Sequence, residues 1–394
     1  MDSITENLEF GDLLKNWPND DILFTQAARD LVKKQSPDLF PIFDWPEIRE
    51  EFKKHDKPAL KAKSQNVKSG RLTLIFSFLG LAISALSTVN LDYESQVRSI
   101  AEIFLLIGIC FGLWHLWKSR HKKTWLGHRY WTERLRQFYF QFLINNAELA
   151  SQATLSSKKL EEYKNKRDSE LESLLRQKPK TAILLEETID DLAERSPWMN
   201  AEWDKEKRVD EGTPNLNQIL DIVGRQRIGI QKEYVTRIMK SGFKSPTKRQ
   251  EAFEGVINTA TVGMIVLSAI AGIIMITNFD FSNLHNFWTP ENIPKDSSQK
   301  SFEISSTPVR TMFCFAAVLG VIVAMIKAID QSLSISASAE RYKWYFASVS
   351  DLETRFKTAQ SSNEKIGLIR ELERLSYQEM RRFLDSNMKA KFGV

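Results

Sequence analysis

Residues 255–279 read GVINTATVGMIVLSAIAGIIMITNF, twenty-five residues without a formal charge. Residues 72–91, LTLIFSFLGLAISALSTVNL, form a second uncharged run, of twenty residues. A run of about eighteen such residues is long enough to cross the hydrocarbon core of a bilayer as a helix. Both stretches therefore predict transmembrane helices, although the mean hydropathy of the whole chain, −0.32, is that of a soluble protein.

Two shorter apolar stretches complete a set of four. Residues 99–117 carry Glu102 near their start, and residues 311–326 are bounded by Arg310 and Lys327. At about 1.5 Å per residue the last stretch covers about 24 Å, so we expect its helix to extend over about 308–327. The two flanking cations can snorkel toward the membrane surface. The alternative for each short stretch is a buried helix of a soluble core.

The basic residues beside the spans predict their orientation. The flanks 53–71, 118–136, 237–255 and 327–345 hold 22 Lys and Arg in 76 residues, against 4 in the 38 residues of 92–98 and 280–310. By the positive-inside rule, both termini and the segment 118–254 are cytoplasmic in a multi-pass inner-membrane protein. The acidic N-terminus has no apolar core of a cleavable signal. Cys110 and Cys314 lie inside spans, so no disulfide is expected.

The chain repeats an order of two spans followed by a helix. A motif of Glu-Arg, a large apolar residue, a basic residue and an aromatic run occurs at 132–140 and again at 339–346. Its charged members are Glu133, Arg134 and Arg136 in the first copy, and Glu340, Arg341 and Lys343 in the second. We therefore predict an N-terminal segment, 1–52, a first repeat, 53–210, and a second repeat, 211–394.

The segments outside the spans have the pattern of helices, so the fold class is an all-α integral membrane protein with four transmembrane helices in two hairpins and long cytoplasmic helices. Trp131, Leu135, Phe138 and Phe142 fall on one helical face. Residues 158–177 mix charges of both signs, which is typical of a solvated helix face. Further helices are expected at 181–195 and 365–385. A break is expected at Glu211-Gly-Thr-Pro214.

Catalytic signatures are missing from the sequence. Gly224 and Gly229 have the glycine spacing of a phosphate-binding loop, but the Lys-Ser/Thr that would follow is absent. His115, His121 and His128 lie beside a membrane edge and a basic run, where interfacial residues are expected rather than metal ligands. We expect no enzyme and no cofactor. The net charge of +5 on 394 residues does not indicate nucleic-acid binding.

Small residues four apart recur within the spans. Such ladders let helix backbones approach closely, within one chain or between subunits of a homo-oligomer. The members are Gly80 and Ser84, Gly108 and Gly112, Ser268 and Gly272, and Ala316, Gly320 and Ala324. Glu102 is the only acidic residue within a span, and an intramembrane carboxylate is a functional candidate, although one this near the outer end can also reach headgroup water.

Aromatic and basic residues gather after the second span. Trp114, Trp117, Trp125 and Trp131 lie among lysines and arginines, which predicts anchors at the inner membrane surface. A pocket for a lipid headgroup or an acidic ligand is the alternative.

The paired spans, their basic inner flanks and the Glu-Arg motif at Glu133 and Glu340 resemble the SLATT domains, two-helix membrane effectors associated with bacterial nucleotide signalling. The chain is similar to two such domains in tandem, at about 60–205 and 225–394. The long loop 278–310 and residues 1–52 depart from that pattern. The resemblance implies a bacterial antiphage effector that oligomerises and permeabilises the membrane when a cytoplasmic sensor protein or a nucleotide signals infection.

Two other functions remain open at this level. A membrane-anchored scaffold would recruit a cytoplasmic partner through the aromatic stripes and residues 1–52, without conducting ions. A small transporter is the weaker alternative, because neither repeat has the interrupted helix that forms a transport site.

Overall fold

The computed structural model describes residues 29–30, 33–34, 36–86, 94–117, 120–176, 208–242, 245–277 and 307–389. Its ordered elements are all helices, and these residues include no strand. The contacts divide the chain into two compact units. Unit 1 comprises Met1–Asn66, Ser119–Lys248 and Ser334–Lys389, and unit 2 comprises Val67–Lys118, Arg249–Leu333 and Ala390–Val394. The all-helical fold class is confirmed.

Unit 2 contains the membrane-type helices. It takes the C-terminal part of α4 (Pro46–Leu86), α5 (Glu94–Trp117), most of α13 (Pro246–Thr277) and α15 (Thr307–Leu333). By length and composition each of these four helices can cross a bilayer, as the sequence predicted. The predicted outer loops, and the last residues of the predicted span 72–91, lie outside the described residues.

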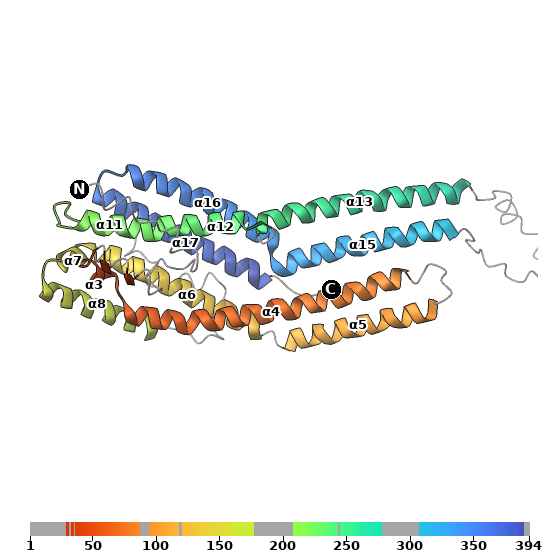
Figure 1. Ribbon diagram of the computed structural model, residues 1–394, viewed down its shortest axis with the longest axis horizontal. Helices are drawn as coiled ribbons and strands as arrows, with labels where there is room; N and C mark the ends of the chain where they lie inside the picture. Colours follow the sequence, from red (N-terminus) through yellow and green to blue (C-terminus); the bar gives the residue numbers. More distant parts are fainter. Residues whose placement is uncertain are drawn as a thin grey trace, which may run out of the picture. The chain divides into compact units, whose positions relative to one another are not determined.

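Within unit 2, small residues allow α4 to contact α5 closely. A Cβ atom placed on Gly108 would lie 2.5 Å from Ser77 Oγ and 2.8 Å from the Ser77 backbone nitrogen. A Cβ atom on Gly80 would lie 2.6 Å from Leu105 Cγ. Helices α13 and α15 run side by side (Figure 1), with Gly320 next to Met264. The ladders of α4 and α5, and Ala316 and Gly320 of the ladder on α15, are therefore occupied by packing inside the chain.

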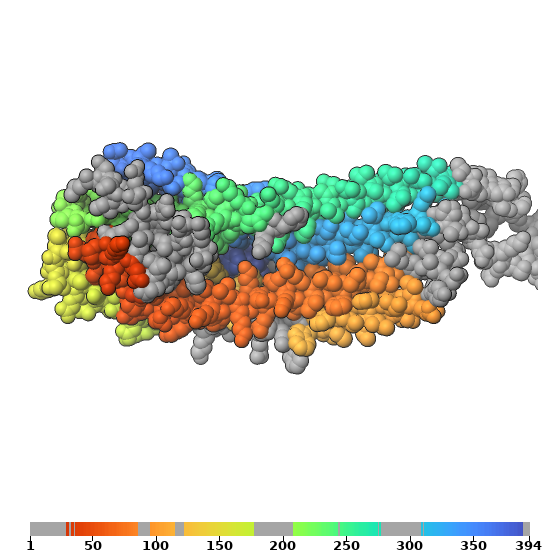
Figure 2. Space-filling model, in the orientation of Figure 1, coloured from red at the N-terminus to blue at the C-terminus, as the bar shows by residue number. Residues whose placement is uncertain are grey.

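The outward faces of these helices are apolar and uncovered. On α5, Ile103, Leu106 and Leu113 are each more than half exposed, and on α13 Ile265 and Ile273 are too. The surface of α13 lies open in the space-filling view (Figure 2). Contiguous apolar surface on this scale indicates contact with lipid or with another protein.

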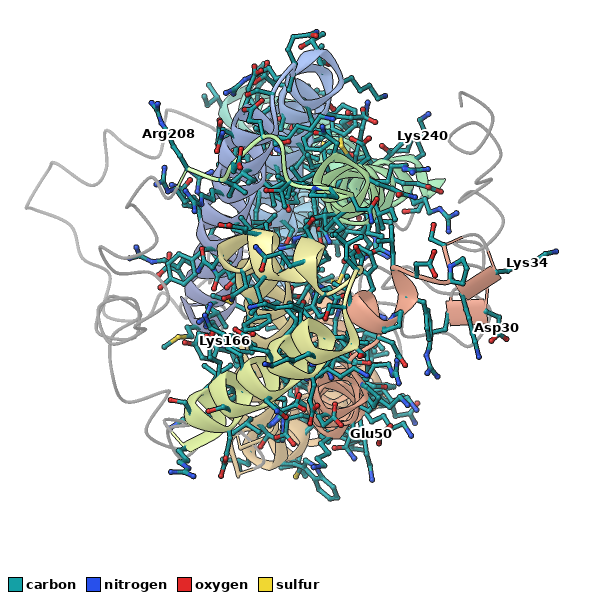
Figure 3. All side chains as sticks on the ribbon, turned by 90° about the vertical axis from the view of Figure 1, so that its left-hand side faces the viewer. Asp30, Lys34, Glu50, Lys166, Arg208 and Lys240 are labelled. Atoms are coloured by element: carbon teal, nitrogen blue, oxygen red, sulfur yellow. The ribbon has the colours of Figure 1, made fainter. Side chains whose placement is uncertain are left out.

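Unit 1 is a bundle of amphipathic helices. Helix α17 packs against α6, α11 and α16, and α12 packs against α16. Figure 3 shows Glu50, Lys166 and Lys240 pointing away from this bundle. Its elements, besides α4 up to Asn66, are α3 (Phe40–Phe43), α6 (Arg120–Asn145), α7 (Ala147–Gln152), α8 (Ser157–Arg176), α11 (Leu216–Gly224), the π-helix η4 (Arg225–Gly229), α12 (Ile230–Lys240), α16 (Ile335–Thr358) and α17 (Ser362–Lys389).

Helix α6 is the centre of the core. The predicted stripe of Trp131, Leu135, Phe138 and Phe142 is at most 4% exposed, which confirms it. The opposite face of the helix is buried as well, with Arg136 only 3% and Phe140 0% exposed, because other helices of unit 1 surround α6. The helices predicted at 158–177 and 365–385 correspond to α8 and to part of α17. The helix predicted at 181–195 lies outside the described residues.

The end of the N-terminal segment is part of this core. The Trp45 ring lies 5.6 Å from that of Phe138 and 5.5 Å from that of Phe142, between centroids. The Arg167 guanidinium of α8 lies 5.0 Å from the Trp45 ring centroid and donates to the Asp44 carbonyl oxygen. The charge run of α8 is therefore solvated except at Arg167, which is 3% exposed.

The glycines of the 224–229 stretch have a structural explanation. Gly224 lies against the Phe356 ring of α16, and a Cβ atom there would meet Cε1 and Cζ closer than van der Waals contact allows. A Cβ atom on Gly229 would meet nothing within 4 Å. Gly224 is thus required for the approach of α11 to α16, whereas Gly229 is not.

We expect Gly224→Ala to destabilise unit 1 by about 1–3 kcal/mol, because the added methyl group overpacks the contact with Phe356. The matched control is Gly229→Ala, which should leave the thermal unfolding temperature of the detergent-solubilised chain unchanged or raise it, since alanine is the better helix former. Phe356→Leu should recover part of the loss in the Gly224→Ala background. Equal unfolding temperatures for the two single variants would contradict this assignment.

Candidate functional site

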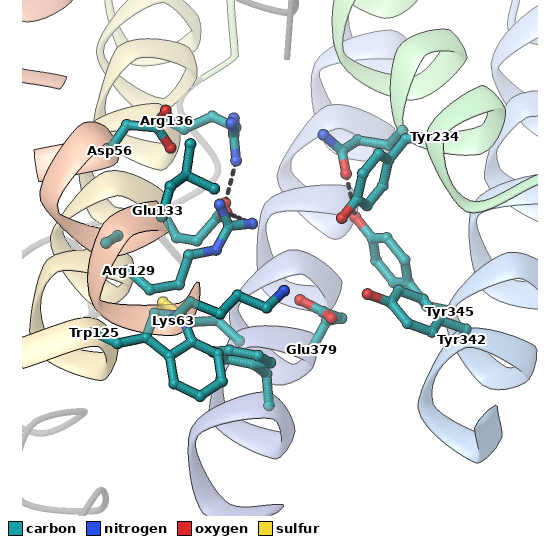
Figure 4. A pocket seen from close by; sticks show the side chains of 15 residues that line it. Asp56, Lys63, Trp125, Arg129, Glu133, Arg136, Tyr234, Tyr342, Tyr345 and Glu379 are labelled. Carbon is teal, nitrogen blue, oxygen red and sulfur yellow. Dashed lines mark hydrogen bonds and ion pairs between the residues drawn. The ribbon is translucent and has the colours of Figure 1, made fainter. Parts of the chain in front are cut away.

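A cavity of about 260 Å³ lies inside unit 1, between α4, α6, α12, α16 and α17 (Figure 4). Its walls combine acidic, basic and aromatic side chains, and all of them belong to unit 1. The lining residues are Asp56, Ala59, Leu60, Lys63, Trp125, Arg129, Glu133, Arg136, Gln231, Tyr234, Tyr342, Tyr345, Glu379, Met380 and Phe383. We refer to this cavity as the unit 1 pocket.

Glu133 lies between two arginines of its own helix. Arg129 and Arg136 stand four residues before and three residues after it, so all three side chains share one face of α6. Arg136 donates to Glu133 Oε2, and Arg129 forms an ion pair with Glu133 Oε1. Burial by itself would raise the pKa of Glu133, but the two guanidinium groups outweigh it and lower that pKa to about 2. Glu133 is therefore ionised at neutral pH.

The second buried carboxylate of the pocket has the opposite shift. Glu379 on α17 forms an ion pair with Arg341 on α16, with 3.0 Å between Glu379 Oε1 and Arg341 Nε. Burial raises the pKa of Glu379, and Arg341 offsets only part of that effect. Two carboxylates with pKa values moved apart thus face one cavity.

Aromatic side chains form the remaining wall. The Trp125 ring meets the Phe383 ring edge-on at 5.7 Å between centroids. Tyr345 lies with its hydroxyl 3.0 Å from Ser376 Oγ and 3.4 Å from Gln231 Oε1. The pKa of Tyr234 is raised, first by the neighbouring Tyr342 phenol and then by burial. Burial also raises the pKa of Tyr345, so the Tyr234 and Tyr345 hydroxyls stay protonated and can donate hydrogen bonds.

Lys63 differs from the other cations of the pocket. Its Nζ atom lies 5.8 Å from the centroid of the Trp125 ring, and in the described part of the chain no carboxylate pairs with it. In Figure 4 its side chain points into the cavity. Three cationic side chains line the pocket, and Arg341 behind Glu379 is a fourth. The acidic side chains of the lining are three, Asp56, Glu133 and Glu379.

The two copies of the repeated motif occupy different places. Glu133 and Arg136 line the pocket, and Arg134 is buried beside it and donates to Gln137 Oε1 at 3.0 Å. In the second copy, Arg341 is buried behind Glu379, whereas Glu340 and Lys343 are exposed. Only the arginines at the second motif position share their burial. The duplication itself remains a prediction.

The residues of the predicted small-residue ladders differ in burial. Gly80 and Gly108 are buried between α4 and α5, and Gly112 lies 3.5 Å from Thr73 Cγ2, measured from a Cβ atom placed there. A Cβ atom placed on Gly272 would have no described atom within 4 Å, and Ala324 is exposed. Ala316 is buried, and Ser84, Ser268 and Gly320 are partly buried.

The predicted membrane-surface residues are likewise separated. Trp114 is 52% exposed on α5, but Trp125 and Trp131 are buried in the core of unit 1, at 7% and 4%. The Trp117 side chain lies outside the described residues. Glu102 is exposed and forms an ion pair with Arg98, 3.3 Å from Nε to Oε1. It makes that contact one turn away on its own helix.

The described residues include no group of three His, Cys, Asp or Glu side chains that could hold a metal ion. His128 lies instead beside His55, with 2.8 Å between the two Nδ1 atoms, and His55 Nε2 is 3.4 Å from Glu51 Oε1. The side chains of His115 and His121 lie outside the described residues. Both cysteines are free thiols, and Cys314 donates to the Ala85 carbonyl oxygen.

Comparison of the chain with protein-family models, with curated proteins and with solved structures finds no match.

Sequence reasoning singled out Glu133 and Arg136 as motif residues, and it named a headgroup or acidic-ligand pocket as the alternative for the cluster that includes Trp125. It did not bring these residues together with Lys63 and Glu379 in one pocket. Lys63 looked like one of seven basic residues on a membrane flank, and Glu379 like one charge of a helix. These two residues are 316 positions apart in sequence, and no local spacing relates them. Their common pocket follows from the packing of α17 against α6, together with the Lys63–Trp125 contact between α4 and α6.

We expect Glu133→Gln to remove a component of acid unfolding. In the unfolded chain Glu133 titrates near its ordinary pKa of 4.5, and in the folded chain near 2, so the stability it contributes is complete above pH 4.5 and is lost as the pH falls toward 2. The free energy of unfolding in urea should therefore fall between pH 4.5 and 3 more steeply for the unmodified chain than for the variant. The difference is up to about 1.4 kcal/mol per pH unit.

Glu371→Gln is the matched control, because Glu371 pairs with Arg355 at the surface, where its side chain is 41% exposed. Its unfolding curve should remain parallel to that of the unmodified chain. Parallel curves for Glu133→Gln would show that the two arginines do not lower the pKa of Glu133.

Proposed function

We propose that this chain is a bacterial inner-membrane effector that assembles into oligomers and permeabilises the membrane. Its four spans would form two hairpins, α4 with α5 and α13 with α15, with both chain termini and unit 1 in the cytoplasm. The distribution of basic residues beside the spans supports this orientation. Antiphage or stress signalling is the biological setting that the resemblance to SLATT domains implies.

The uncovered apolar faces of unit 2 carry this proposal. In the windows that qualify α5 and α13 as spans, only 11% of the residues are buried inside the chain. Such faces need lipid or copies of the same helices around them, because water would solvate them poorly. A chain with four faces of this kind has ample surface for both environments.

Specific helix positions favour assembly through α13 and α15. The small residues of α4 and α5 are already used for contacts inside the chain, whereas Gly272 is open and Ala324 is exposed. Small residues on an open face allow a second copy of the helix to approach closely. We therefore assign the contacts between subunits to this pair of helices.

The polar residues of the spans are likewise buried on α4 and accessible on α13. Ser77 is 9% exposed beside Gly108, so it cannot face a water-filled path. Asn258 on α13 is exposed, and Thr261 and Ser268 are partly buried. A path for ions lined by several copies of α13 would present these three side chains.

The scaffold function without conduction is the second candidate. In this function the aromatic stripes would recruit a partner, but the stripe of α6 is buried in the core of unit 1, with Phe138 and Phe142 at 0% exposure. On α16, Val349 is buried as well, and Tyr342 and Phe346 on the same face are partly buried. A scaffold would therefore have to use other surfaces of unit 1, which makes it the weaker proposal.

We expect expression of the full chain in bacteria to depolarise the inner membrane, measured with a membrane-potential dye. Gly272→Leu should reach the membrane in equal amount, because no atom of the described residues lies within 4 Å of a Cβ atom placed there, but it should give at most one tenth of the dye response. A soluble partner that co-purifies in stoichiometric amount, with no ion flux in liposomes, would instead establish the scaffold function.

The same substitution separates assembly from folding. Gly272→Leu should lower the oligomer mass of the detergent-solubilised chain while leaving its thermal unfolding temperature within about 2 °C of the unmodified chain, since α13 itself is not strained. Gly108→Leu should lower the unfolding temperature, because its side chain would collide with the Ser77 backbone. An unchanged oligomer for Gly272→Leu would remove α13 from the subunit contact.

A further inference from the structure

We propose that the unit 1 pocket binds a small molecule that carries a phosphate group, with the phosphate between Lys63 and Arg129 and the less polar part against Trp125. The inference concerns unit 1 alone and does not depend on the membrane activity proposed above. It rests on the charge left uncompensated in the pocket, on the donors that surround that charge and on the size of the cavity.

The charges of the pocket favour an anion. Glu133 is tied to two arginines, and Glu379 to Arg341, so neither carboxylate is available to a cationic ligand. Lys63 has no acidic partner in the part of the chain that the structure describes. Four cations against three acids leave a net positive charge, which increases whenever Glu379 is protonated. When Glu379 is protonated the excess is two charges, which a dianionic group compensates and a carboxylate does not.

The donors around Lys63 suit tetrahedral oxygens. Arg129 carries five N–H donors, and one carboxylate can accept no more than two of them in a fork, so the guanidinium retains donors for a ligand. Glu133 holds this guanidinium in place through an ion pair, which lowers the entropy lost when a ligand binds. The Tyr234 hydroxyl, which stays protonated, lines the same cavity, and so does that of Tyr342. Phosphate accepts hydrogen bonds from all three kinds of donor.

The shape of the pocket limits the ligand to a small molecule. About 260 Å³ is below the usual size of a site for a drug-sized ligand and far too small for a polymer. The apolar side chains of Leu60, Met380 and Phe383 accompany Trp125 in its wall. The Trp125 indole ring lies beside the Lys63 ammonium group. A phosphate bound to Lys63 therefore places the apolar part of the same ligand near this ring.

The test is calorimetric titration of the full chain in a neutral detergent with four probes. Phenyl phosphate is the main probe, and inorganic phosphate measures the contribution of the headgroup alone. Dihexanoyl phosphatidic acid, used below its micelle concentration, presents the same group on a lipid. Benzoate offers a ring and a carboxylate without phosphate. We expect phenyl phosphate to bind at least tenfold more tightly than benzoate and than inorganic phosphate.

The ratio of the two organic phosphates identifies the source. Tighter binding of phenyl phosphate assigns the pocket to a soluble metabolite, and tighter binding of the phosphatidic acid assigns it to a lipid headgroup. Either result supports a phosphate site. Benzoate binding as tightly as phenyl phosphate, or no binding of any phosphate probe, would overturn it.

Matched variants locate the binding to the pocket. Lys63→Met should weaken phenyl phosphate binding at least tenfold. Lys61→Met should leave it within twofold, because Lys61 is exposed on the same helix, as Lys63 is, but does not line the pocket. Lys63→Arg keeps the positive charge and should restore binding to within about threefold. Thermal unfolding of each variant checks that the chain is folded. Equal affinities for Lys63→Met and Lys61→Met would overturn the assignment.

Discussion

A buried pair of opposite charges holds the helices of unit 1 in register. Arg227 Nε, on the π-helix η4, lies 2.6 Å from Glu373 Oε1 on α17, and neither side chain is more than 2% exposed. The same guanidinium lies 4.9 Å from the Phe140 ring centroid on α6. Removing one partner of such a pair leaves a buried charge, at a cost of about 3–5 kcal/mol. The positions of η4, α17 and α6 therefore depend on one another.

Polar groups continue around this pair through the core. Arg134, Gln137, Gln141 and Gln226 are each at most 2% exposed. Buried polar groups demand specific partners, whereas apolar groups tolerate many neighbours. The Arg227–Glu373 pair thus restricts how η4, α17 and α6 can pack, and this packing brings Glu133 of α6 and Glu379 of α17 to one pocket. Unit 2 has the reverse design, with close helix contacts at Gly80 and Gly108 and apolar faces directed outward.

The sequence predicted the helices far better than the site. Periodicity and length identified four spans, the stripe of α6 and the ends of α8, because these signals lie within one helix. The burial of Arg134 and Trp125 escaped it, since a basic or aromatic residue beside a membrane span has the same local pattern whether lipid or protein covers it. Trp45 could not be placed either, because its contacts on α6 and α8 are about a hundred residues away.

By itself the sequence determined that this is an all-helical protein with four membrane-type spans, because hydrocarbon thickness and helical rise act on consecutive residues. Only the tertiary structure decided which small residues are already used and which remain open. It alone brought Lys63, Arg129 and Glu379 to one pocket. Charge compensation and close packing depend on distances between helices, and those distances have no counterpart in the local order of residues.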